Sequence, residues 1–79
     1  MKLIYDPRYN VAYLSLQEKT AEVETVKISD ALNVDMSPDG TIYGIELLNA
    51  NEQLRAADKG KLIIVNESSG ERQEVSLTP

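Results

Sequence analysis

The residues of this chain that could do chemistry are carboxylates, four tyrosines, hydroxyls and eight basic side chains, because its 79 residues include neither cysteine nor histidine. These two absences exclude thiolate and Ser-His-Asp nucleophiles, imidazole metal ligands and iron–sulfur ligation. What remains is oxygen chemistry: proton transfer by carboxylates and phenols, or the binding of a hard cation.

The first candidate pair is Tyr5 and Asp6, which precede Pro7. At the end of a hairpin they would present a phenol and a carboxylate side by side, as an acid–base or ligand-binding pair. In the alternative interpretation Tyr5 packs and Asp6 closes the turn through its side chain, because Asp before Pro commonly starts a turn. We favour the turn.

A second candidate is a cation site formed by Asp35, Asp39 and Glu46, whose oxygens suit calcium or magnesium. Against it, Asp35 is expected to point outward from a strand and Asp39 to sit in a turn, and the spacing matches no EF-hand loop. The sequence therefore predicts no metal site and no cofactor.

Two polar clusters have similarly ordinary interpretations. Glu22 and Glu24 share a strand face, within reach of one sugar or metal, but a 79-residue sheet has little room for the deep cleft of a glycosidase. Residues 68–70, Ser-Ser-Gly, offer hydroxyls and amides to an anion without the strand–loop–helix context of a phosphate loop. We predict a solvated face for the first cluster and a hairpin turn for the second.

The tyrosines are the only aromatic residues of the chain, and tyrosine is favoured where an apolar surface meets water at an interface. Core packing and interface contact are both open for Tyr5, Tyr9, Tyr13 and Tyr43. Tyr9 is the strongest interface candidate, because it lies in a turn where its own chain can bury it least.

Alternation of apolar and polar residues dominates the chain and predicts strands. After residue 48 the period changes: Asn49 is placed to cap a helix, Glu52 to reach back to it, and Gly60 to take the left-handed position past its end. We predict an α+β fold, an antiparallel β-meander of five to seven strands with one short helix packed on the sheet. The expected strands span residues 2–5, 11–16, 22–28, 32–36, 41–48, 61–65 and 72–77, and the helix residues 50–59.

The clearest local signal is the hairpin of residues 32–48, with Ser-Pro-Asp-Gly at 37–40 as its turn. In its second strand the apolar phase slips at Gly44. A bulge or a positive φ at Gly44 would return Ile42, Ile45 and Leu47 to a common face.

The first hairpin bears on association. If Tyr5 pairs with Val11, then Leu3 pairs with Tyr13, and both faces of the hairpin are apolar. A single short helix cannot cover two faces, so we expect either the C-terminal strands or a second copy of the chain to cover the other. We predict self-association, a homodimer that uses an apolar face or edge with tyrosine.

Several segments resemble a widespread family of short bacterial and archaeal proteins, the family of domain of unknown function 2283. They are the opening Lys-Leu-Ile-Tyr-Asp-Pro, the Ala-Tyr-Leu-Ser-Leu strand at 12–16, and residues 33–35 with 39–48. The resemblance covers residues 2–52 and implies no established activity; it suggests a companion protein, antitoxin-like or regulatory. Relatives are expected to be more acidic where Arg8 and Tyr9 stand, which argues against a carboxylate site at that turn.

Length and charge narrow the functional classes further. We predict one α+β domain over residues 1–79, made of the family-like region 2–52 and the C-terminal helix and strands of residues 50–79. The net charge is −5, which disfavours nucleic acid and anionic membranes and admits a basic protein partner. We expect a cytoplasmic, non-enzymatic interaction module; the alternative is a small carboxylate- or metal-dependent enzyme or ligand-binding domain.

Overall fold

The segments in which apolar and polar residues alternate form short strands separated by turns, as the sequence predicts. The structure is a computed structural model that describes residues 1–77. It contains, in chain order, β1 (Lys2–Asp6), β2 (Val11–Ser15), β3 (Glu24–Ser29), β4 (Leu32–Met36), β5 (Ile42–Leu47), α1 (Ala50–Arg55), the 3-10 turn η1 (Asp58–Gly60), β6 (Lys61–Val65) and β7 (Arg72–Ser76). The predicted α+β class is confirmed.

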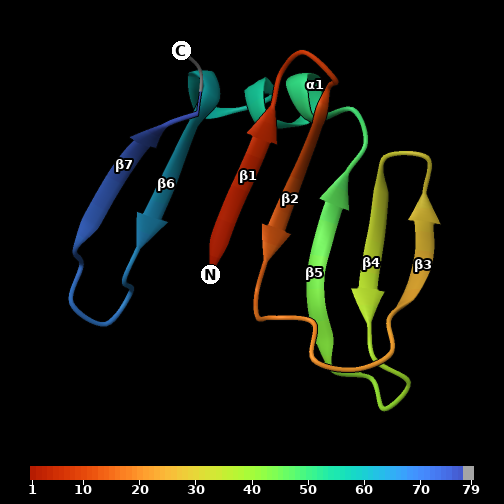
Figure 1. The fold of residues 1–79 in the computed structure, drawn as a ribbon. Coiled ribbons are helices and arrows are strands. Elements are labelled where there is room, and N and C mark those ends of the chain that lie inside the picture. Colours follow the sequence, from red (N-terminus) through yellow and green to blue (C-terminus); the bar gives the residue numbers. More distant parts are fainter. Residues whose placement is uncertain (78–79) are drawn as a thin grey trace.

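The strands form two separate antiparallel sheets (Figure 1). The larger has five strands in the order β1-β2-β5-β4-β3, so the connection from β2 to β3 crosses to the opposite edge. The smaller is the hairpin of β6 and β7, which we call the C-terminal hairpin. Figure 1 shows this hairpin set apart from β1, with α1 and η1 linking the two sheets at one end.

The register predicted for the first hairpin is wrong by one residue. Val11 pairs with Asp6, and Tyr5 pairs with Ala12. The connection is a four-residue turn, residues 7–10, which Asn10 closes in the left-handed region with φ 59°. Because a one-residue slip moves the side chains of one strand to the other face, the expected membership of the two faces is wrong as well. Leu3, Tyr5, Ala12 and Leu14 share one face, and Ile4, Asp6, Val11 and Tyr13 share the other, so both faces still carry apolar side chains.

The helix is shorter than predicted, six residues rather than ten. It ends because Ala57, which follows the C-cap Ala56, is extended with φ −136° and ψ 166°. Asp58, Lys59 and Gly60 then adopt left-handed backbone conformations, with φ 53°, 56° and 77°. The predicted left-handed Gly60 is confirmed, although it is the last residue of the 3-10 turn η1 and does not directly follow α1.

The predicted helix cap is also wrong. The side chain of Asn49 accepts a hydrogen bond from Gln53 Nε2 at 2.5 Å and does not cap the backbone. Asn10, far upstream, takes that role: its Oδ1 accepts the Asn51 N–H at 2.7 Å, and its carbonyl accepts the Ala50 N–H at 3.1 Å. The first turn thus supplies the acceptors that the first helical N–H groups need.

The turn between β4 and β5 is confirmed. Gly40 takes φ 92° and donates its N–H to the Ser37 carbonyl at 3.0 Å. The carboxylate of Asp39 accepts the Thr41 N–H at 3.0 Å and the hydroxyl of Ser37. Hydrogen bonds from Ser37 and Thr41 lower the pKa of Asp39 from 3.8 to about 2.

A bulge lies beside Gly44, as predicted, although the positive φ expected as the other possibility is absent. Gly44 pairs with Asp35 and Ile42 with Met36, which leaves Tyr43 as the extra residue of β5. This extra residue returns Ile42, Ile45 and Leu47 to one face of the sheet.

Candidate interaction surface

One face of the five-stranded sheet is apolar from edge to edge. Residues directly opposite one another on neighbouring strands share a face, and two such rows are almost wholly apolar. The first row is Leu3, Leu14, Ile45, Val34 and Val26, and the second is Tyr5, Ala12, Leu47 and Leu32. These two rows give the sheet one apolar face.

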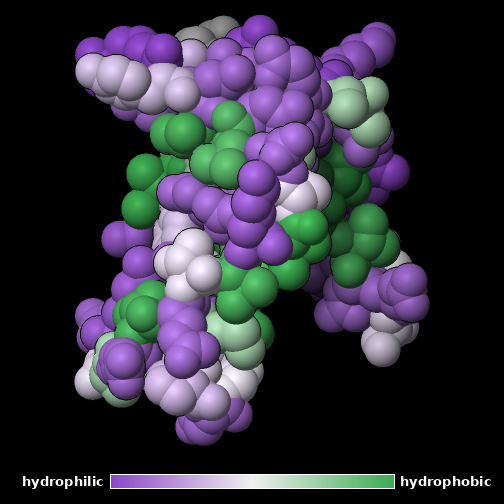
Figure 2. Space-filling model, turned by 90° about the vertical axis from the view of Figure 1, so that its right-hand side faces the viewer, coloured by the Kyte–Doolittle hydropathy of each residue, from purple (hydrophilic) through white to green (hydrophobic). Residues whose placement is uncertain are grey.

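A groove of about 340 Å³ opens on this face. Every residue that lines it is leucine or isoleucine: Leu3, Leu14, Leu32, Ile45 and Leu47 from the sheet, Leu54 from α1, and Leu62 and Leu77 from the C-terminal hairpin and its end. We call it the apolar groove. Figure 2 shows hydrophobic side chains gathered around the hollow between two projecting parts of the molecule.

The chain by itself buries little. Among residues 1–77 the buried hydrophobic residues are Ala12, Tyr43 and Ala50, and no large side chain is fully buried. Several aliphatic side chains of the C-terminal hairpin are half exposed, including Ile64 at 50% and Val65 at 54%. Such a surface is typical of a subunit rather than of an isolated monomer.

The accessible surface and the radius of gyration are both larger than those of a compact monomer of this size. The accessible surface is 5781 Å², whereas a monomer of this mass typically exposes about 4,800 Å². The radius of gyration is 14.0 Å, against about 11.6 Å for a compact domain of this length. The chain therefore exposes roughly 1,000 Å² more than a self-contained monomer of its size.

The opposite face of the sheet carries a polar cluster centred on Asp35. Its carboxylate accepts hydrogen bonds from Tyr13 Oη at 3.0 Å and Thr25 Oγ1 at 2.7 Å. Lys19 Nζ lies 3.0 Å from the same carboxylate and 4.9 Å from the centre of the Tyr13 ring. The sequence analysis singled out Tyr13 and Asp35 separately but did not bring them together.

The pKa shifts in this cluster keep each of its three groups in its ordinary protonation state at pH 7. Burial opposes ionisation of Asp35, but hydrogen bonds from Thr25, Lys19 and Tyr13 outweigh it and hold the pKa of the carboxyl below its ordinary value. Burial and the bond to Asp35 raise the pKa of Tyr13, and the bond to Asp35 raises that of Lys19. A neutral phenol, a cation and a carboxylate at pH 7 indicate structural stabilisation rather than proton transfer, since a general acid or base works best near the working pH.

We expect Asp35→Asn to destabilise the fold by about 2 kcal/mol at pH 7, because it weakens hydrogen bonds to a charged group. A carboxyl whose pKa is lowered by folding stabilises the native state above its unfolded value of about 3.8 and loses this contribution as the pH falls through its folded pKa. The difference between wild type and variant should therefore shrink in urea titrations below pH 3.8.

Asp30→Asn is the matched control for this experiment. Asp30 pairs with Lys27 at 2.9 Å, but its side chain is almost fully exposed, so the change should be nearly neutral. Equal effects of the two substitutions would contradict the structural role of Asp35.

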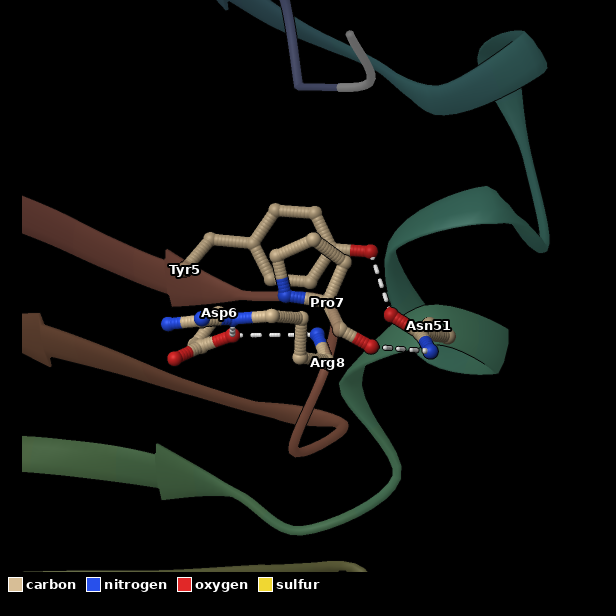
Figure 3. A network of polar contacts seen from close by, with 5 residues as sticks. All are labelled: Tyr5, Asp6, Pro7, Arg8 and Asn51. Atoms are coloured by element: carbon tan, nitrogen blue, oxygen red, sulfur yellow. Dashed lines mark hydrogen bonds and ion pairs between the residues drawn. The ribbon is translucent and has the colours of Figure 1, made fainter.

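The candidate pair Tyr5 and Asp6 does not converge (Figure 3). Tyr5 Oη donates to Asn51 Oδ1 at 2.5 Å, and Asn51 Nδ2 donates to the Pro7 carbonyl at 3.1 Å. Asp6 instead accepts the Arg8 N–H at 3.0 Å, as a turn-closing residue does. Figure 3 shows the two side chains directed to different partners, Tyr5 toward α1 and Asp6 toward Arg8.

The acidic candidates do not assemble into a metal site. Within residues 1–77, no three acidic, histidine or cysteine side chains are grouped to hold an ion. Asp35 and Asp39 serve the contacts already described, and Glu46 accepts a hydrogen bond from Asn33 at 3.2 Å. Glu22 and Glu24 are exposed, as predicted.

The Ser-Ser-Gly segment is the turn of the C-terminal hairpin, as predicted. Asn66 Oδ1 accepts the N–H groups of Ser68 and Ser69 at 3.0 and 3.3 Å, so these amides already have an acceptor. Gly70 takes φ 77° and donates to the Asn66 carbonyl.

The four tyrosines have different surroundings. Tyr43 is buried, while Tyr5 and Tyr13 are half-buried and hydrogen-bonded within the chain. Tyr9 is 73% exposed in the first turn, beside Arg8. None of the four lines the apolar groove. A binding role for Tyr9 therefore remains a prediction. The groove is lined by leucine and isoleucine, which alternation places on strand faces without marking a groove.

A five-stranded antiparallel sheet with one apolar face, a short helix and a separate two-stranded hairpin define a small α+β protein. Over residues 2–51 the chain matches the family described as protein of unknown function (DUF2283), and it belongs to that family. No curated protein and no solved structure matches the chain. Within residues 1–77, no helix has the length and apolar character to cross a membrane.

Proposed function

We propose that this protein is a non-enzymatic, self-associating protein-interaction module, in which a second protein chain covers the apolar groove. The observation that carries the proposal is the unburied apolar surface: among residues 1–77 no large side chain is fully buried, and the chain exposes roughly 1,000 Å² more than a monomer of its mass. A stable interface covers about 800 Å² of each partner, which is close to this excess.

The lining of the groove favours a protein over a small ligand or substrate. Its volume of about 340 Å³ is within the range of ligand pockets. Such pockets also carry a few polar groups that orient the ligand, whereas only leucine and isoleucine line this groove. The cluster of Asp35, Tyr13 and Lys19 lies on the opposite face of the sheet, so it could not act on a molecule in the groove.

A basic protein partner is a second candidate, in keeping with an antitoxin-like or regulatory role in the cytoplasm. The observation in its favour is the net charge of −5, with eight of the thirteen acidic residues in the first fifty. Association through charge weakens as salt screens it, whereas burial in the apolar groove does not. Salt dependence of binding therefore separates the two kinds of partner.

The test is the oligomeric state. We expect sedimentation equilibrium at micromolar protein to give a dimer that persists in 0.5 M salt. We also expect the melting temperature to rise with protein concentration, because association stabilises the folded state by mass action. A monomer up to about 100 μM, with a melting temperature independent of concentration, would contradict the proposal.

A further inference from the structure

We propose that the apolar groove is occupied by the C-terminal hairpin of a second copy, and that two copies exchange hairpins in a two-fold symmetric dimer. This inference rests on the proposed self-association and adds which segment of the partner is bound. It starts from the hairpin itself.

The hairpin has one apolar face and one face that mixes charged and apolar residues. Leu62 pairs with Val75, and Ile64, two residues on, shares their face, as Leu77 does by alternation. The other face carries Ile63 and Val65 beside an ion-paired cluster, in which Glu74 lies 3.5 Å from Lys61 and 3.1 Å from Arg72. Inserting the apolar face into a groove would therefore leave these charges in water.

The large sheet of the same chain does not bury the apolar face of the hairpin. Only Leu62 and Leu77, near the base of the hairpin, reach the apolar groove. Leu62, Ile64 and Val75 remain 42%, 50% and 45% exposed, and no strand of the large sheet pairs with β6 or β7. A two-stranded hairpin is marginally stable alone in water. It needs a surface that its own chain does not supply.

One chain thus carries both halves of a contact, a groove without polar lining and a hairpin with a matching apolar face. When both halves are on the same molecule, a two-fold axis lets each copy satisfy the other, which closes the assembly at two. The excess exposed area of roughly 1,000 Å² is what one subunit of a stable dimer covers. A small foreign ligand would leave the hairpin uncovered.

The first experiment compares two charge substitutions of equally exposed isoleucines. Ile64 is 50% exposed on the apolar face of the hairpin, and Ile4 is 52% exposed on the opposite face of the large sheet, where it pairs with Tyr13. We expect Ile64→Glu to raise the dimer dissociation constant at least 100-fold in sedimentation equilibrium, because it would bury an unpaired charge. We expect Ile4→Glu to leave the constant within about threefold of wild type.

The second experiment locates the hairpin without a substitution. In a mixed dimer of ¹³C-labelled and unlabelled chains, isotope-filtered NOEs should connect the methyl groups of Ile64 and Val75 in one copy to those of Leu14 and Ile45 in the other. A dimer with intermolecular NOEs only between the two sheets, or one that Ile4→Glu dissociates instead, would overturn hairpin exchange and leave self-association standing. A monomeric wild type would overturn both.

Discussion

Gly44→Ala should destabilise the protein by about 3 kcal/mol, the largest effect that we expect from adding one methyl group. A Cβ at Gly44 would lie 2.5 Å from Tyr13 Cζ and 2.7 Å from the Leu14 carbonyl oxygen, besides meeting Tyr13 Oη. The tyrosine ring cannot withdraw freely, because its hydroxyl bonds Asp35, and the carbonyl belongs to the backbone of the adjacent strand. Thermal unfolding followed by circular dichroism should show a melting temperature lower by more than about 10 °C.

Gly70→Ala is the control for this substitution. Gly70 has nothing within 4 Å of the position that a Cβ would take, so its only cost is that of a left-handed conformation at φ 77°. That cost is about 1 kcal/mol. If Gly44→Ala lowers the melting temperature no more than Gly70→Ala does, then the ring of Tyr13 does not lie over Gly44. That result would contradict the geometry of the polar cluster around Asp35.

Asn10→Ala should cost about 2 kcal/mol, since it combines two main losses, besides an exposed hydrogen bond from Asn10 Nδ2 to Glu52 Oε2 at 3.3 Å. The variant removes the side-chain acceptor for the Asn51 N–H, a helix cap whose loss costs about 1 kcal/mol. It also places alanine at φ 59°, which costs about 1 kcal/mol more. Urea unfolding at neutral pH measures the change in the free energy of unfolding, with an unchanged slope if the same surface is exposed.

Asn10→Gly separates the two losses, because glycine accepts the left-handed backbone but cannot cap. We expect about half the effect of alanine. A glycine variant as unstable as the alanine variant would assign the whole effect to the cap, and one as stable as wild type would remove the cap from the account.

Local signals predicted the elements that depend on local chemistry. The bounds of β4 and β6, the turn at residues 37–40 and the bulge beside Gly44 follow from alternation and from the conformations that proline and glycine permit. The register of the first hairpin was mispredicted because it depends on a left-handed Asn10, which the residue type allows but does not require.

Long-range contacts could not be predicted in the same way. The cap from Asn10 to Asn51 and the bond from Tyr13 to Asp35 join residues 41 and 22 positions apart, and no spacing rule connects them. The exposure of the apolar face was expected for a physical reason, the shortage of elements to cover it. The expectation of tyrosine at a contact stays a prediction: Tyr5 lies on the apolar face, but the lining of the groove is aliphatic.

Asn51 has a consequence for the order in which the chain can fold as it is synthesised. It is the last residue of the family match, and its side chain bonds Tyr5 and the Pro7 carbonyl while its N–H bonds Asn10. The end of the family-matched region is therefore hydrogen-bonded to its beginning. Once residue 51 has left the ribosome, the five strands and these hydrogen bonds can form together, while the residues of the C-terminal hairpin are still inside the exit tunnel. We expect the five-stranded sheet of the nascent chain to fold first, with its apolar face exposed, and the C-terminal hairpin to fold and pack last.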